Sequence, residues 1–356
     1  MNTLDRYLAR ALAVGWLLVL VVLLAIFGLI QFVQEMEAIS GHYQIGQVSE
    51  FVLRTLPQLA LDLVPVAGLL GTLLVLANLA RHSELTALRA AGLSSGRLLV
   101  AVLLPTALLA ASIPVVAQFV SAPLYEKAEA TRSVLRSSRS SLLAGKGLWS
   151  NNGRRFFNVR QLRHGHIPVN IEYYEFDDDG KLVMYAHADH ADLDQTREWS
   201  LGDVHRKTWT GDAPVTEKLD TLDMGPFWKK EELPVLSLST SAMSLSSLYH
   251  YNEYLKQTGQ KNDRFELALW QKLSLPFATL AMVFLAVPIG ATVSSQRSAD
   301  FARRLGTGAV IGILFYLGSQ ILQSSASLSR LPIPVLVFIP VAMVAAAAVY
   351  LFRKLP

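Results

Sequence analysis

Cysteine is absent from this chain of 356 residues, and charged residues make up only 17% of it. Without cysteine, neither a disulfide framework nor a thiolate metal site can form. The phosphate-binding pattern G-x-x-x-x-G-K-[ST] and the zinc-binding pattern H-E-x-x-H are also missing. We therefore predict that the chain is not an enzyme, with no catalytic residue and no cofactor of its own.

Metal-ligand side chains gather at one place in the sequence, at His187, Asp189, His190 and Asp192. On a strand these residues alternate between the two faces, and no second cluster accompanies them. We therefore favour a polar strand surface over a metal site.

Hydrophobic residues make up 52% of the chain, which is more than a soluble domain needs for its core. A transmembrane helix needs about 20 mostly apolar residues to cross a hydrocarbon layer about 30 Å thick. The first apolar stretch is longer than the core of a signal peptide, so we expect it to be retained. The apolar stretches predict a membrane α-helical bundle of six transmembrane helices, at 11–34, 56–80, 98–121, 268–293, 306–325 and 332–352.

Lysine and arginine collect in the loops on one side of these predicted spans. By the positive-inside rule this side is cytoplasmic, so both termini are expected in the cytoplasm and the region 122–265 outside it. The net charge of +4 needs no nucleic acid to explain it. The basic residues in question are Arg6, Arg10, Arg81, Arg89, Arg97, Arg297, Arg303, Arg304, Arg353 and Lys354.

The region between the third and fourth spans has the alternating pattern of half-buried strands. Turn residues separate the strands at 177–180 and 211–212. We predict an all-β, jellyroll-like domain with flanking helices at 122–265, between helices 1–3 at 1–121 and helices 4–6 at 266–356. The expected strands are 155–161, 169–176, 181–193 and 199–208.

A short polar stretch at 83–94 interrupts the apolar sequence between the second and third spans. It has the length of a two-turn amphipathic helix on the cytoplasmic side. Glu84 would lie in its first turn, where a helix N-terminus favours an anion, and Ser83 could cap it. The stretch is either a lever for a partner protein or a solvated loop.

Several features together resemble the LptF/LptG family of permeases, and the LptG branch more than the LptF branch. They are the order of the spans, the β insert and a set of short motifs. Each motif is weak alone, whereas their order and spacing are specific. The motifs are Asp5-Arg6-Tyr7, Ser83-Glu84-Leu85 ending in Gly92, Gly147-Leu148-Trp149, and Trp270-x-Lys272 with Pro276.

The resemblance implies a permease subunit of an ATP-binding-cassette exporter in the Gram-negative inner membrane. Such an exporter takes lipopolysaccharide from the outer leaflet and passes it to a periplasmic bridge. The implied partners are LptF as the second permease chain, a dimer of the ATPase LptB, and LptC and LptA at a periplasmic β domain. ATP would be used by LptB alone. The residues implied for coupling to LptB are Ser83, Glu84, Leu85, Arg89 and Gly92.

The implied substrate carries phosphates, which bind lysine and arginine near the external interface. Candidates are Lys272, Arg132, Arg136 and Arg54. The family places lysines near the external ends of spans one and two, where this chain has other residues, so the contacts are expected to be shifted to other positions or to LptF.

Two further regions of the chain have an implied role. The small residues Gly308, Gly312 and Ser319 allow close packing of span five, which the family uses with span one as a lateral gate. In the β domain, an apolar groove or an ordinary core would use the positions expected to face inward, Phe156, Val159, Tyr173, Phe176, Val183 and Tyr185.

Two other functions stay open at this point. A secondary transporter would need ionisable groups near the membrane midplane, and Asp62 and Lys272 are the charged residues within the spans that bear on this. The alternative for Asp62 is solvation at the external interface. Lys272 could either snorkel to the surface or contact an anionic ligand. A membrane-anchored binding or scaffold protein would use its β domain and need no coupling helix.

Overall fold

The computed structural model describes most of the chain. The described residues are 3–37, 39, 43–136, 148–152, 154–163, 167–193, 199–209, 214–224, 240–257, 263–291, 298–324 and 331–354. The helices are α1 Thr3–Met36, α2 Ile45–Arg81, α3 Glu84–Ala90, α4 Ser95–Val116, the π-helix η1 Ala117–Ser121, α5 Ala122–Arg136, α7 Leu245–Gln257, α8 Asp263–Ala291, α9 Ser298–Ser324 and α10 Ile333–Arg353.

Six of these helical segments are long and apolar enough to cross a membrane, as the sequence predicted. The third crosses as one continuous helix, because α4, η1 and α5 follow one another without a break. Several helices extend beyond the predicted spans, and α2 begins at Ile45 rather than at position 56. Hydropathy finds only the apolar part of a helix, and the backbone continues into polar sequence on either side.

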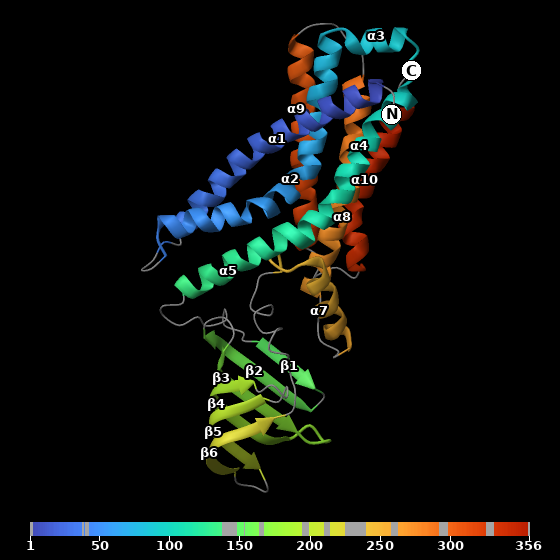
Figure 1. The fold of residues 1–356 in the computed structure, drawn as a ribbon. Helices are drawn as coiled ribbons and strands as arrows, with labels where there is room; N and C mark the ends of the chain where they lie inside the picture. Colours follow the sequence, from blue (N-terminus) through green and yellow to red (C-terminus); the bar gives the residue numbers. More distant parts are fainter. Residues whose placement is uncertain are drawn as a thin grey trace.

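The bundle has two distinct ends (Figure 1). Helix α3, the N-terminal part of α1 and the C-terminal end of α10 lie together at one end, and the β-sheet lies at the other. Helices α2 and α8 are the most buried of the six spans, whereas α1 and α9 expose most of their side chains. The bundle is therefore built around α2 and α8, with α1 and α9 at its periphery.

Helices α1 and α2 approach closely at a pair of glycines. A Cβ atom at Gly71 would lie 2.9 Å from the carbonyl oxygen of Gly15 and 2.9 Å from the Cα atom of Trp16. The indole Nε1 of Trp16 donates a buried hydrogen bond of 2.9 Å to the hydroxyl of Thr72. Small residues at such crossings let helix backbones pack together where lipid supplies no hydrophobic driving force.

Gly71→Ala is expected to destabilise the bundle by about 1–3 kcal/mol, because the added methyl group meets backbone atoms that cannot move aside easily. The matched control is Gly306→Ala, since a Cβ atom there meets nothing within 4 Å. Thermal unfolding in detergent should show a lower midpoint for the first variant only. Equal midpoints would contradict the close approach of α1 and α2.

The described part of the inserted domain is an antiparallel sheet of six strands, which confirms the all-β domain predicted between the third and fourth spans. The strands follow one another in chain order across the sheet. Strands β1 and β6 were not predicted, because both lie at the edges and lack regular alternation of apolar residues. The strands are β1 Leu148–Asn152, β2 Arg155–Arg163, β3 Ile167–Phe176, β4 Leu182–Leu193, β5 Trp199–Trp209 and β6 Pro214–Met224.

The two faces of the sheet differ in burial. One face carries a buried apolar cluster that includes Phe157, Val159 and Tyr173. The interpretation of six residues as one inward-facing set was wrong, because successive positions on a strand point to opposite faces. The set was Phe156, Val159, Tyr173, Phe176, Val183 and Tyr185, and Tyr185 pairs with Tyr174. Phe156 pairs with Tyr174 across the strands, so both lie on the opposite face from Phe157. Val159 and Tyr173 are core residues.

Candidate functional site

Helix α3 is followed by a residue whose backbone conformation favours glycine. Gly92 has φ 91°, in the left-handed region that glycine adopts without strain. The amide of Gly92 donates to the carbonyl of Arg89 at 2.9 Å, and the amide of Leu93 donates to that of Leu88 at 3.0 Å. These two bonds form a Schellman motif, which turns the chain from α3 into α4.

The start of α3 differs from the prediction. Ser83 is the N-cap residue, but its side chain makes no capping hydrogen bond. Its backbone has φ 61° and ψ 5°, whereas a capping side chain needs an extended backbone to reach the helix amides. The predicted capping role of Ser83 was therefore wrong.

Side chains of α3 bond to two of the membrane helices. The hydroxyl of Tyr7 on α1 donates to the carboxylate of Glu84 at 2.7 Å. The guanidinium of Arg89 donates to the carbonyl oxygen of Ala291, at the end of α8, at 2.8 Å. Leu85 is fully buried in a cluster that also includes residues of α1, α4 and α8. Helix α3 is thus attached to both a peripheral and a central helix.

A second contact fixes the same end of α1. The guanidinium of Arg97, in the first turn of α4, donates to both carboxylate oxygens of Asp5 at 2.8 Å. Both bonds come from the same guanidinium nitrogen, and hydrogen bonds between charged groups are stronger than neutral ones. The N-terminal turns of α1 are therefore held between α3 and α4.

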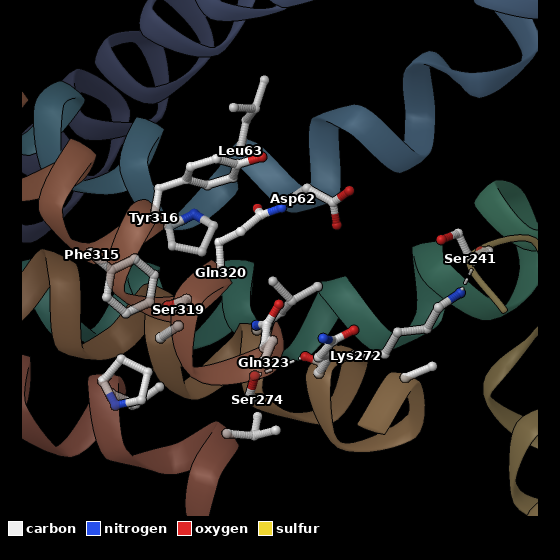
Figure 2. A pocket seen from close by; sticks show the side chains of 18 of the residues that line it. Asp62, Leu63, Ser241, Lys272, Ser274, Phe315, Tyr316, Ser319, Gln320 and Gln323 are labelled. Carbon is white, nitrogen blue, oxygen red and sulfur yellow. Dashed lines mark hydrogen bonds between the residues drawn. The ribbon is translucent and has the colours of Figure 1, made fainter. Parts of the chain in front are cut away.

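A cavity of about 410 Å³ lies within the bundle, among residues of α1, α2, α8, α9 and α10 (Figure 2). Phe27 of α1 and Tyr316 of α9 both line it. Apolar side chains share its wall with a group of polar ones, which is unusual inside a membrane span. The polar residues of the cavity include Gln58, Asp62, Gln271, Lys272, Ser274, Ser319, Gln320 and Gln323.

The ammonium group of Lys272 is held at the side of the cavity near Ser241 (Figure 2). Its Nζ atom donates to the backbone carbonyl oxygens of Ser241 at 3.0 Å and of Met243 at 2.7 Å. Lysine has three N–H donors, so these bonds leave one for another acceptor. Lys272 is only 8% exposed and lies inside the bundle, where the interpretation as a snorkelling residue would have placed it at the surface.

Asp62 lines the same cavity, and its side chain is exposed there. Its carboxylate accepts a hydrogen bond of 3.0 Å from the Gln58 side chain. The side-chain amide oxygen of Gln58 in turn accepts a hydrogen bond of 2.7 Å from the hydroxyl of Ser121. Ser121 belongs to the π-helix η1, a distortion that often accompanies functional sites.

The other predicted phosphate contacts lie outside this cavity lining. Arg54 is paired with Glu50 one turn earlier on α2. The guanidinium of Arg132 donates to both carboxylate oxygens of Glu35, at 2.7 and 2.9 Å, and lies over the ring of Phe51. The side chain of Arg136 lies outside the described part of the chain. Lys272 is thus the predicted cation that the structure brings to the cavity.

Arg132→Met is expected to destabilise the protein by about 1–3 kcal/mol, because Glu35 is buried and would lose its charged partner. The control is Arg54→Met, which removes an exposed pair within one helix and should cost less than about 1 kcal/mol. Thermal midpoints in detergent compare the two. If Arg132→Met leaves the thermal midpoint unchanged but weakens lipopolysaccharide binding, Arg132 is a substrate contact instead.

The two glycines predicted for the lateral gate lie on the side of α9 that packs against α2. A Cβ atom at Gly308 would overlap the side chain of Leu73, and one at Gly312 would lie 3.1 Å from Val66. Ser319 lines the cavity (Figure 2). The glycines therefore explain how α9 packs on α2, and a gate between α9 and α1 stays a prediction.

Sequence reasoning missed several of the residues in these sites. The sequence predicted no contact for Tyr7 beyond its place in a family motif, and it predicted no role for the glutamines of the cavity. The available signal was a set of polar residues within otherwise apolar spans, which mark functional positions in membrane proteins. Which of them share one cavity depends on helix packing.

The fold and the cavity define a class: a multi-pass membrane protein with an antiparallel β domain inserted between its third and fourth spans. The family model described as "Lipopolysaccharide export system permease LptF/LptG" matches residues 6–354. The chain belongs to this family, which confirms the resemblance found from its motifs.

Two relatives cover nearly the whole chain. The lipopolysaccharide export system permease protein LptG of Haemophilus influenzae is 30% identical over 350 residues, covering 95% of this chain and 96% of that protein. The LptG protein of Escherichia coli K12 is 27% identical over 329 residues, covering 90% and 89%. This likeness agrees with the LptG branch that the sequence indicated.

Proposed function

We propose that this chain is the LptG-like permease subunit of an ATP-driven exporter in the inner membrane, which extracts lipopolysaccharide from the outer leaflet. Its partners in this proposal are LptF as the second permease chain, a dimer of the ATPase LptB, and LptC and LptA as the periplasmic bridge. The family match over nearly the whole chain is the observation that carries the proposal.

Helix α3 is the part of the chain that receives work from LptB. It lies at the end of the bundle opposite the sheet, where the positive-inside rule places the cytoplasm (Figure 1). A displacement of α3 would act on α1 through the contact between Tyr7 and Glu84, and on α8 through the contact between Arg89 and Ala291. Both contacts are hydrogen bonds to a charged group, which are stronger than neutral ones.

The cavity of Figure 2 is the part that contacts the substrate. Helix α8 ends at Ala291, which Arg89 of α3 contacts, and it also carries Lys272, so movement of α3 would reach the cavity along one helix. Lys272 has an N–H donor left for a phosphate oxygen, and Phe27 and Phe315 supply apolar surface for acyl chains. Phe27 on α1 and Tyr316 on α9, both peripheral helices, line the cavity, and these two helices would form the lateral gate that admits the substrate.

The β domain is the part that passes the substrate on. Its described edge strands, β1 and β6, have unpaired edges that can add a strand from a similar domain. In this proposal the sheet lies in the periplasm, and the bridge proteins continue the path from it.

Co-purification tests the assignment. Affinity-tagged protein, extracted in mild detergent from a Gram-negative membrane, is expected to bring down a nucleotide-binding subunit and a second permease chain in stoichiometric amounts. The same tag on an unrelated six-span protein is the control. Recovery of the chain alone would favour a secondary transporter or a membrane-anchored scaffold instead.

A further inference from the structure

An aromatic pocket lies on the face of the sheet opposite the buried core. It has a volume of about 560 Å³, within the range of small-molecule sites. Four aromatic side chains line it: Trp149, Phe156, Tyr174 and Phe176. Trp149 belongs to the motif Gly147-Leu148-Trp149 at the start of the domain. The proposed function gives this motif no role.

The rings of this pocket are arranged as a platform. The rings of Trp149 and Tyr174 are stacked, with centroids 6.1 Å apart and planes 21° from parallel. Phe156 and Phe176 meet edge to face at 5.5 Å. Trp149 is nonetheless 47% exposed, so the platform is open to a ligand.

Polar groups surround the platform. Arg154 and Asp178 form an ion pair of 2.9 Å at the pocket, beside the turn that Asp177 fixes through the amides of Asp179 and Lys181. The hydroxyl of Tyr174 donates to the buried carboxylate of Glu172 at 3.2 Å. Burial raises the pKa of Tyr174 to about 12, so this hydroxyl stays protonated at neutral pH.

We propose that this pocket binds a pyranose ring from the saccharide part of the substrate, a proposal that rests on lipopolysaccharide being the cargo. A pyranose has a face of polarised C–H groups, which the negative face of an aromatic ring attracts, and a rim of hydroxyls. The stacked rings of Trp149 and Tyr174 would contact this face, and Arg154 and Asp178 would bind hydroxyls.

An acyl chain fits this pocket less well. It would set its methylenes beside the ion pair of Arg154 and Asp178. The two faces of the sheet thus separate two chemistries: the apolar cluster around Phe157 on one, and the saccharide site on the other.

The test uses the full-length protein in detergent and the deacylated, water-soluble oligosaccharide of lipopolysaccharide as the probe. Saturation-transfer NMR and calorimetry measure its binding. Wild type is expected to bind, Trp149→Ala to bind about 10-fold more weakly, as removal of a central aromatic contact does at other sites, and Trp149→Phe to recover most of the affinity.

The matched control is Tyr249→Ala, an exposed aromatic residue on α7 that should leave binding unchanged. Equal thermal midpoints show that the variants remain folded. The proposal is overturned if wild type does not bind the oligosaccharide, if Trp149→Ala binds it normally, or if decanoate displaces it. These results are independent of co-purification with an ATPase, so the two proposals can fail separately.

Discussion

Replacing Glu84 with alanine is expected to lower lipopolysaccharide-stimulated ATP hydrolysis by the assembled complex about 10-fold, which corresponds to about 1.4 kcal/mol of activation free energy. The substitution removes the carboxylate in the first turn of α3 and with it the hydrogen bond from Tyr7 on α1. Motion of α3 would then no longer be passed to α1. The measurement is ATP turnover by purified complex in nanodiscs, with and without lipopolysaccharide.

Tyr7→Phe separates two explanations of this effect. It removes only the hydroxyl that bonds Glu84, and it leaves the surface of α3 that would meet LptB unchanged. If transmission to α1 matters, Tyr7→Phe should reduce stimulation while the complex still assembles. Glu50→Ala, a distant exposed carboxylate on α2, is the control. Normal stimulation in Glu84→Ala would reject the coupling role.

Lys272→Met is expected to weaken lipopolysaccharide binding to the complex about 10-fold, since hydrogen bonds to charged groups contribute about 1.5–3 kcal/mol. Methionine keeps most of the length and volume of the side chain and removes the ammonium group. It also leaves the carboxylate of Asp62 in the cavity without its nearby cation. Lys272→Met with Asp62→Asn removes both charges and tests whether binding is lost through the missing cation or through the unbalanced anion.

Photocrosslinking shows whether the substrate occupies the cavity. A photoreactive residue at Ser319, which lines the cavity, is expected to form adducts with lipopolysaccharide. Ile313 on the same helix is exposed on the outer surface and serves as the control. Crosslinks at positions 272 and 136 extend the test. Adducts at other positions of the bundle, with none at 272, 136 or 319, would reject the assignment.

The parts of the fold that depend on local chemistry could be predicted from the sequence. Six spans follow from hydropathy, because backbone groups in lipid must bond within one helix. The end of α3 follows from Gly92, since few other residues adopt its positive φ. The family could be recognised because it depends on the order of such signals along the whole chain.

The parts of the fold that depend on packing could not be predicted from the sequence. Glu35 and Arg132 are 97 positions apart, and nothing in the sequence near either residue indicates that they form an ion pair. Asp62 and Lys272 were both noticed as charges within spans, but their common cavity requires the packing of α2 against α8. The capping role of Ser83 also failed, because its backbone has φ 61° and ψ 5°, a conformation that its residue type does not predict.

The account is tested most directly by ATP-dependent extraction of lipopolysaccharide from proteoliposomes. The chain is reconstituted with its second permease chain and the ATPase, and transfer to a soluble periplasmic acceptor is followed over time. We expect transfer that requires ATP, is lost in Glu84→Ala and is reduced in Lys272→Met. Transfer that proceeds equally without ATP, or that is unchanged in both variants, would contradict the account.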